Sequence, residues 1–313
     1  MVAPLNDLLG TLRFGQPVCH QRLEVVPLLA PTQQHGVAYI TYDEAIAASK
    51  LLLEEVGAAG SVPHLLATNL GSERVLIPDG TTLVGCKQNR VVNVTILLES
   101  ESKTVIPVSC VERGRWSLLS KLFAAGSTGD KELRTKMCQD ATRSLKHGAQ
   151  VRVSQHKVWQ HVDDVLRAAK ADSPSAAYHA AYAEKQPEFA EFKQAISLPR
   201  ETVGVAVAVD GSCELVEVFD RPEAFARLWQ RLLDGYVVSL GQRPRAQVAV
   251  SANAAEFLRR VAQAPHEAFP AVGVGTSVRF ESDGLTGAAL VCDDQVVHLA
   301  AFATPHNTSN SGT

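Results

Sequence analysis

Hydrophobic and polar positions follow different periods along this chain, and two apolar runs in its first third are the most distinctive. Residues 91–98 and 104–111 are rich in β-branched side chains, as strands are, and a short polar segment, 99–103, joins them. Residues at equal distances from the connection of a hairpin become cross-strand neighbours. The pattern therefore predicts that residues 87–90 and 109–115 meet at one end of a sheet.

The rest of the first 130 residues is also predicted to be mainly β-structure. Thr41 and Glu44 have the spacing of a capping box, so a helix begins there; its apolar positions extend to Val56, and Gly57 ends it. Pro78-Asp79-Gly80 favours a turn. Strands are expected at 21–31, 64–70 and 74–77, and short helices at 5–12 and 118–124.

The pattern changes to a helical period in the middle of the chain. Residues 131–196 are predicted to be mostly helical. Within them Val158, Val162, Val165 and Leu166 form the apolar stripe of an amphipathic helix over residues 151–171. A further helix, over 175–196, is expected to break near Pro187.

A period of two returns after residue 201. Asp210-Gly211 lies between two alternating apolar runs, which predicts a hairpin over residues 203–219, and Pro222 then begins a helix. Further strands are expected at 246–250, 276–281, 287–292 and 296–302, with a helix at 252–262.

These groups of strands, with helices between them, predict an α+β fold with mainly antiparallel sheets and a helical segment between two β-rich regions. Residues 1–130 are expected to form the first β-rich region and residues 131–200 the helical segment. Residues 201–304 either complete the same domain or form a second sub-domain. Residues 305–313 have the composition of a disordered tail.

Composition excludes some classes of partner. The chain is 46% hydrophobic and 20% charged, and its net charge is −3, which argues against broad binding of nucleic acid or of an anionic membrane. No apolar run is long enough to span a membrane. The basic run at residues 131–157 is interpreted as a solvated helical face.

Cysteine spacing and the first residues favour a cytoplasmic protein. The 6 cysteines are scattered, without the spacing of metal ligands, and residues 1–15 lack a basic start followed by an apolar core. We therefore expect free thiols in a reducing compartment, no metal site and no bound cofactor. The chain also lacks the GxGxxG, GxxxxGK[ST], HExxH and GxSxG motifs; Gly273-Val274-Gly275 is the nearest approach to a phosphate loop, but it is followed by a strand.

The polar residues at the ends of the two central runs form the candidate site, with two interpretations. In the first interpretation, Lys87, Arg90 and Arg115 bind an anion such as a phosphate. Asn89 and Asn93 then bind ribose hydroxyls or an amide of the ligand. In the second, Arg90 or Arg115 pairs with Glu112 in a buried structural network.

Other candidates carry similar alternatives. Cys110 is either a nucleophile activated by neighbouring cations or a core thiol, and Glu112 is the acid/base candidate. Gln155 and Trp159 lie one helical turn apart and either bind a base or anchor the helix. The catalytic candidates are Glu112 and Cys110, and the ligand-binding candidates are Lys87, Gln88, Asn89, Arg90, Asn93, Arg115, Trp116, Gln155, Trp159 and His298.

Several segments together resemble a known bacterial family. They are 83–90, 93–95, 106–112, 114–116, Gln155 with Trp159, the hairpin followed by Asp220 and Phe225, 287–291 and 297–302. The chain resembles the ADP-ribosylglycohydrolase- and rhodanese-phosphatase-superfamily-associated protein domain over roughly residues 20–303. That resemblance implies a link to NAD and ADP-ribose metabolism, but no mechanism. We therefore expect a protein that binds, and in the stronger form processes, an ADP-ribose-like or other small phosphorylated nucleotide. The alternative is a non-catalytic interaction domain in which the same polar cluster is structural.

Overall fold

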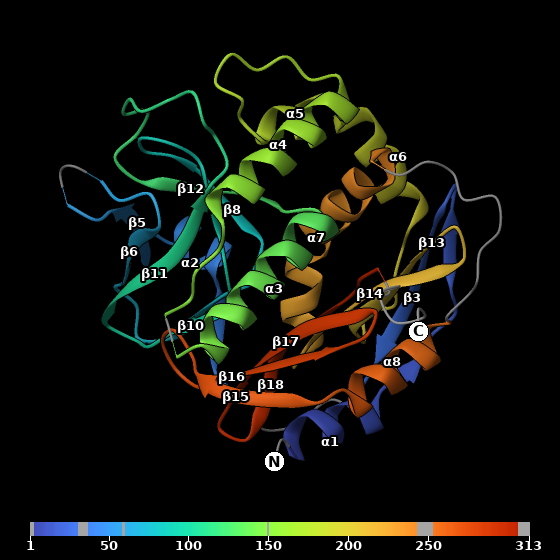
Figure 1. Ribbon diagram of the computed structural model, residues 1–313. Coiled ribbons are helices and arrows are strands. Elements are labelled where there is room, and N and C mark those ends of the chain that lie inside the picture. Colours follow the sequence, from blue (N-terminus) through green and yellow to red (C-terminus); the bar gives the residue numbers. More distant parts are fainter. Residues whose placement is uncertain (1–2, 31–36, 58–59, 149, 243–252, 306–313) are drawn as a thin grey trace, which may run out of the picture.

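Antiparallel sheets and the helices packed between them make up this protein (Figure 1). The computed structural model describes residues 3–30, 37–57, 60–148, 150–242 and 253–305. Within those residues there are 8 helices and 18 strands, and the strand pairs are antiparallel except for one. The predicted α+β class is confirmed.

The largest sheet combines the start of the chain with its last third. Its hairpin turn is formed by Asp210 and Gly211, both with positive φ (50° and 81°), as the favoured two-residue hairpin turn requires. The order is β1 (Arg13–Phe14), β3 (Leu23–Leu29), β13 (Thr202–Val209), β14 (Ser212–Phe219), β18 (Gln295–Ala303), β17 (Leu285–Cys292), β16 (Thr276–Ser282) and β15 (His266–Pro270), with β2 (Val18–His20) also on β3.

Two smaller sheets come from the first β-rich region. The six-stranded sheet has the order β12 (Phe123–Thr128), β8 (Thr81–Gly85), β9 (Arg90–Val92), β11 (Ser102–Cys110), β6 (His64–Asn69) and β5 (Leu51–Glu55). The three-stranded sheet has the order β10 (Ile96–Leu98), β7 (Arg74–Ile77) and β4 (Tyr39–Thr41), where β4 and β7 are parallel.

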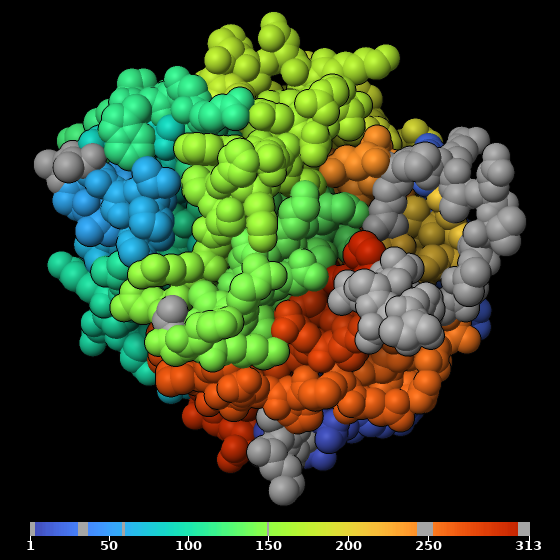
Figure 2. Space-filling model, viewed as in Figure 1, coloured from blue at the N-terminus to red at the C-terminus, as the bar shows by residue number. Residues whose placement is uncertain are grey.

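Helices fill the space between the sheets. In Figure 1, α3 (Lys131–Lys146) and α7 (Pro222–Gly241) lie between the first β-rich region and the large sheet, and Figure 2 shows α3 and α4 (Gln155–Ala169) across the middle of one face of the molecule. The helices are α1 (Ala3–Thr11), α2 (Tyr42–Ala47), α3 (Lys131–Lys146), α4 (Gln155–Ala169), α5 (His179–Glu184), α6 (Gln186–Ala195), α7 (Pro222–Gly241) and α8 (Ala254–Gln263). The break near Pro187 is confirmed, because α5 and α6 are separate.

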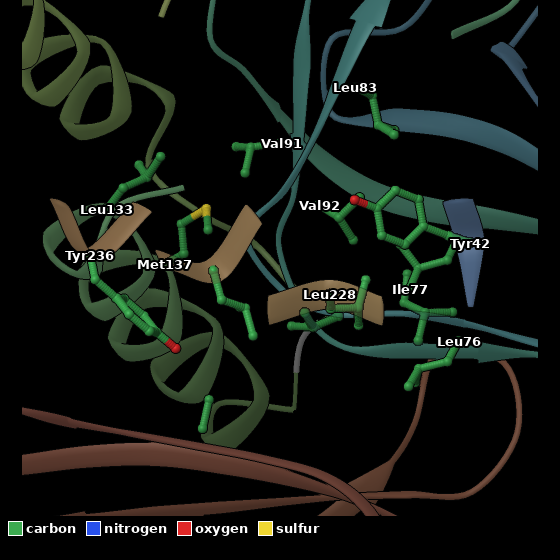
Figure 3. Close-up of a cluster of buried hydrophobic side chains, with 14 of the residues drawn as sticks. Tyr42, Leu76, Ile77, Leu83, Val91, Val92, Leu133, Met137, Leu228 and Tyr236 are labelled. Carbon is green, nitrogen blue, oxygen red and sulfur yellow. The ribbon is translucent and has the colours of Figure 1, made fainter. Parts of the chain in front are cut away.

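One hydrophobic cluster joins the three stretches of the chain. Figure 3 shows Tyr42 of α2, Ile77 of β7 and Val92 of β9 near Met137 of α3 and Leu228 of α7. All five side chains are at most 3% exposed. The packing of α3 and α7 therefore depends on residues from both ends of the sequence.

Three predicted elements were wrong. The helix that begins after Thr41 ends at Ala47, not Val56, because Leu51 and Leu53 alternate with half-buried positions and pair with β6. The helix predicted at 118–124 is absent: residues 117–122 form a loop, and Phe123 begins a strand that pairs with β8. The strand at 246–250 and most of the tail, 306–313, lie outside the described residues.

The third error concerns the central hairpin. Residues 91–98 form two strands in different sheets, β9 and β10. Val108 pairs with Val92, so the next residue of the first strand, Asn93, lies opposite Pro107. The Asn93 backbone N–H donates to the Pro107 carbonyl (3.1 Å), but proline has no N–H to donate to Asn93 in turn. The ladder stops there and the chain crosses to β7.

A buried ionic network connects α3 to the large sheet. The Arg134 guanidinium donates to both carboxylate oxygens of Glu217 (2.7 Å each) and also to Asp79 (3.1 Å). Glu217 also contacts His298 Nε2 (3.0 Å) and accepts from the Tyr236 hydroxyl (2.6 Å). His298 is 1% exposed, so this candidate ligand-binding residue has its contacts inside the protein.

These contacts make the fold sensitive to acid. Although burial opposes ionisation, the Arg134 charge and the His298 hydrogen bond hold the pKa of Glu217 well below its ordinary value. A lowered native pKa contributes stability that is present above the unfolded pKa, near pH 4.3, and is lost as the pH falls. We expect the free energy of unfolding to decrease between about pH 5 and pH 3.

Glu217→Gln tests this assignment by chemical denaturation at several pH values. The variant leaves Arg134 buried without a full partner, so it should lose roughly 3–5 kcal/mol at neutral pH and show a smaller acid dependence. Glu184→Gln, at an exposed position, is the matched control and should resemble the parent. An unchanged acid dependence in Glu217→Gln would contradict the assignment.

Candidate functional site

The two segments predicted to converge lie side by side. Cys110 pairs with Arg90 and Ser109 with Val91, and the Val111 amide donates to the Asn89 carbonyl (3.1 Å). The short β9–β11 ladder therefore brings residues 87–90 against residues 109–115. This placement follows from the hairpin register even though the hairpin itself is interrupted.

Arg115 is held by protein groups on every side. It makes a two-pronged contact with Glu112, from Nε to Oε1 (2.9 Å) and from Nη2 to Oε2 (2.6 Å). Its other hydrogens go to the carbonyls of Cys86 (2.6 Å) and Ser117 (2.9 Å). All of its strong donor directions are satisfied, which favours the structural interpretation of this arginine.

Glu112 completes the same network. Its carboxylate accepts hydrogen bonds from the backbone N–H of Asn89 (3.1 Å) and the Ser175 hydroxyl (2.8 Å), in addition to those from Arg115. Burial opposes ionisation, but the Arg115, Ser175 and Asn89 hydrogen bonds outweigh it and keep the pKa of Glu112 below its ordinary value. A saturated, ionised carboxylate is a poor general acid and a weak base.

Lys87, Arg90 and Trp116 form a second group of contacts. Arg90 is 0% exposed; its Nη1 donates to the Gln88 carbonyl (3.1 Å), and its Nη2 lies 3.6 Å from Glu55. Both cations make cation–π contacts with Trp116: Lys87 Nζ lies 5.4 Å and the Arg90 guanidinium 5.8 Å from the centre of its ring. The anion-binding group of the sequence analysis is therefore split between two internal networks.

The Cys110 thiol is enclosed. It is 0% exposed and donates to Gln88 Oε1 and the Glu112 carbonyl (3.1 Å each), and burial raises its pKa. Gln155 accepts from the Cys110 amide (2.8 Å) and donates to its carbonyl (2.7 Å), so the glutamine extends the sheet like one residue of a strand. Trp159 Nε1 is buried and has no hydrogen-bond partner among the described residues.

A cavity of about 430 Å³ lies beside this region, where β11 meets the start of α4. Asn93 and Ser109 line it, and the Ser109 hydroxyl donates to Asn93 Oδ1 (2.8 Å). Asn93 is 4% exposed, and no partner within the described residues binds its Nδ2. The remaining lining residues are Val62, Pro63, His64, Val108, Gln150, Val151, Arg152, Val153 and Gln155.

The charge of the cavity wall is one-sided. Arg152 is the charged residue among those lining it, and none of the described lining residues carries a carboxylate. Gln155 is also the first residue of α4, whose first turn contains no acidic side chain. Backbone N–H groups and the helix dipole favour an anion at such a position, which gives this cavity an electropositive wall.

Comparison with known proteins gives a family and no closer relative. The family model described as "ARG and Rhodanese-Phosphatase-superfamily-associated Protein domain" matches residues 11–302. This chain belongs to that family. No curated protein and no solved structure matches it.

Family membership confirms the resemblance seen in the sequence, and the family name associates this chain with those superfamilies. No helix in the described part of the chain is long and apolar enough to cross a membrane. Among the same residues, no group of three or more His, Cys, Asp or Glu side chains is placed to hold a metal ion.

The cavity contains some of the predicted residues and adds others. Asn93 and Gln155 were candidates in the sequence, whereas His64 and Arg152 were not. Arg152 belongs to the basic run interpreted as a solvated face, and its position in the first turn of the helix predicted over residues 151–171 was the available signal. His64 is brought to the cavity by pairing of β6 with β11, across 43 residues of sequence from Pro107.

Arg115→Lys tests the structural interpretation of the Arg115–Glu112 pair. Lysine keeps the charge but cannot make the two-pronged contact, so the free energy of unfolding should fall by roughly 1–3 kcal/mol. Arg113→Lys is the matched control, because Arg113 makes a similar contact with Asp163 at an exposed position and should change stability little. Equal stabilities of the two variants in chemical denaturation would contradict the interpretation.

Cys110 should also be chemically protected. In the native protein at pH 8, iodoacetamide is expected to modify the exposed Cys19 well before the buried Cys110, because only the accessible thiolate reacts. Peptide mass spectrometry over time measures both rates, and denaturant should make them similar. Native labelling of Cys110 as fast as Cys19 would restore it as a nucleophile candidate.

Proposed function

We propose that this protein binds a small phosphorylated ligand of the nucleotide class, with ADP-ribose the first to test, in the cavity between β11 and α4. The observation that carries the proposal is the pairing of a roomy cavity of about 430 Å³ with a wall that holds Arg152 but, among its described residues, no carboxylate. A phosphate group is anionic and accepts several hydrogen bonds, so it suits such a wall.

Individual groups have distinct roles in this proposal. Arg152 and the first backbone amides of α4 contact the phosphate, and Asn93 Nδ2 donates to a phosphate or ribose oxygen. Ser109 fixes the orientation of the Asn93 amide, because its hydroxyl donates to Oδ1. Val62, Val108 and Val153 supply an apolar surface for a base or sugar.

Family membership supports the nucleotide class, since the family name associates the chain with the ARG and rhodanese-phosphatase superfamilies. The proposal covers binding. The processing of the ligand at this cavity has less support, because Glu112 and Cys110 are engaged in internal contacts.

Asn93→Asp is the sharpest test of this cavity. The carboxylate still accepts from Ser109, but it replaces the amide donor with a negative charge that repels phosphate. Thermal shift and calorimetric titration with ADP-ribose, NAD, nucleotides and sugar phosphates should show a ligand that stabilises the parent. A ligand at 100 times its Kd adds roughly 2.7 kcal/mol. Asn93→Asp should bind it at least about tenfold more weakly, consistent with the loss of a charge-assisted hydrogen bond.

Two controls keep the result specific. Asn6→Asp makes the same change at an exposed position of α1, and Arg200→Ala removes an exposed arginine outside the cavity. Both should bind like the parent, whereas Arg152→Ala should bind more weakly. Full affinity in Asn93→Asp and Arg152→Ala would exclude this cavity.

A second function, the interaction domain, has one observation in its favour. The loop after the Arg115 network exposes Trp116 (49%), Leu118 (62%), Leu119 (68%) and Leu122 (40%). Exposed apolar side chains clustered in this way are typical of contact surfaces. The absence of a thermal shift with every phosphorylated ligand would favour this function over nucleotide binding.

A further inference from the structure

A second cavity, of about 520 Å³, lies between α3, α4 and the end of α7. None of the residues singled out as site candidates in the sequence lines it. The described lining residues are Glu132, Lys136, His161, Asp164, Arg167, Ala168, Gly241 and Gln242. Because this cavity shares no lining residue with the cavity beside β11, the two can be tested independently.

A buried carboxylate lies behind the cavity wall. Asp130 is 0% exposed and precedes the first residue of α3, where its Oδ1 accepts from the Glu132 amide (3.0 Å) and the Leu133 amide (3.1 Å). Its Oδ2 accepts from the Tyr178 hydroxyl (2.5 Å). With these donors in place, the carboxylate remains ionised inside the protein.

This carboxylate fixes the tautomer of His161. The Nε2 atom of the ring lies 2.7 Å from Asp130 Oδ2, and a carboxylate accepts hydrogen bonds only, so Nε2 carries a hydrogen. In the neutral ring Nδ1 then has a free lone pair. Lys136 Nζ lies 3.1 Å from that atom, so the lysine is the donor.

The result is a chain of three groups, Lys136–His161–Asp130, that ends in the cavity. A proton can pass from the lysine ammonium to His161 Nδ1, because the resulting imidazolium faces a buried carboxylate. The lysine becomes a neutral amine next to the base that activated it. The neutral amine is the form in which a lysine acts as a nucleophile.

We propose that Lys136 is an imine-forming lysine for small aldehydes that carry an anionic group. The neutral Nζ attacks the carbonyl carbon and forms a carbinolamine. The protonated His161 then returns its proton to the carbinolamine hydroxyl, the C–O bond breaks, and water leaves as the C=N bond forms. One amine and one aldehyde give one imine and one water, with no oxidation or reduction.

The anionic group is assigned from the other donors of the wall. The wall also carries the carboxylates of Glu132 and Asp164, and Arg167 Nη1 donates to Asp164 (3.0 Å). The remaining N–H groups of Arg167 and the Gln242 Nε2 atom, which is buried without a hydrogen-bond partner within the described residues, are the donors left for a ligand. Both suit the oxygens of a phosphate or carboxylate. An open-chain sugar phosphate has this combination of an aldehyde and an anion.

Reductive trapping tests the proposal on the full chain. The protein is incubated at pH 7 with a limiting amount of glyceraldehyde 3-phosphate and cyanoborohydride, and alkylation of each lysine is measured over time by peptide mass spectrometry. Lys136 should be alkylated at least about tenfold faster than Lys170, an exposed lysine at the end of α4. A rate no higher than that of Lys170 would overturn the proposal.

The variant His161→Gln separates activation from mere exposure. Glutamine accepts a hydrogen bond but takes no proton, so the advantage of Lys136 over Lys170 should disappear, while Lys157 and Lys170 are alkylated as before. A retained advantage would overturn the role of His161.

A pH series on the unaltered protein covers the case in which this variant does not fold. Between pH 7 and pH 9 the rate at an ordinary lysine rises roughly tenfold per pH unit, because its pKa is near 10.4. Glu132 and Asp164 line the same cavity and favour the ammonium form of Lys136, whereas transfer of its proton to His161 favours the amine. The proposal requires this transfer to prevail, so the rate at Lys136 should rise much less steeply; parallel profiles for Lys136 and Lys170 would overturn it.

Discussion

The Arg134–Glu217 ion pair is the interaction on which the arrangement of this protein depends most. Arg134 comes from the helical middle of the chain, Glu217 from the hairpin of the last third and Asp79 from a turn in the first β-rich region. A buried guanidinium tolerates few alternative positions, because any displacement leaves charges unpaired in a low-dielectric interior. Gly80 reinforces this requirement: its φ is +79°, and a Cβ there would lie 2.6 Å from the Arg134 side chain.

The pairing of buried charges also explains why only some of the predicted site residues remain available to a ligand. Residues at the ends of β9 and β11 carry many charges in a small volume, and most of them neutralise one another. Arg115 and Glu112 pair, and Arg90 lies opposite Glu55. The cavity begins where this network ends, at Asn93 and Ser109, and there the polar groups keep some unused hydrogen-bonding capacity. Polar residues concentrated in a sequence therefore locate a region, while their contacts decide which of them remain available to a ligand.

Much of the fold could be predicted from local signals. The Asp210-Gly211 turn and the stripe containing Val158 and Val162 have local physical causes, so their elements were predicted correctly. The errors at Leu51 and Phe123 arose where pairing with a distant strand overrode local preference.

The site was predictable to a smaller extent. The meeting of residues 87–90 with 109–115 followed from hairpin register, but Pro107 interrupts the ladder and redirects the chain. The partners of Arg90 and the contributions of His64 and Arg152 to the cavity depend on tertiary contacts that no spacing in the sequence expresses.

The two hydrogen bonds between the Gln155 side chain and the Cys110 backbone attach helix α4 to strand β11. These bonds fasten the first turn of α4 to the edge of β11, so the helix follows any displacement of that strand. Six residues further along the same helix is His161, about 9 Å away at 1.5 Å per residue. The helix therefore connects the two cavities, because it places Gln155 in the wall of one and His161 in the wall of the other.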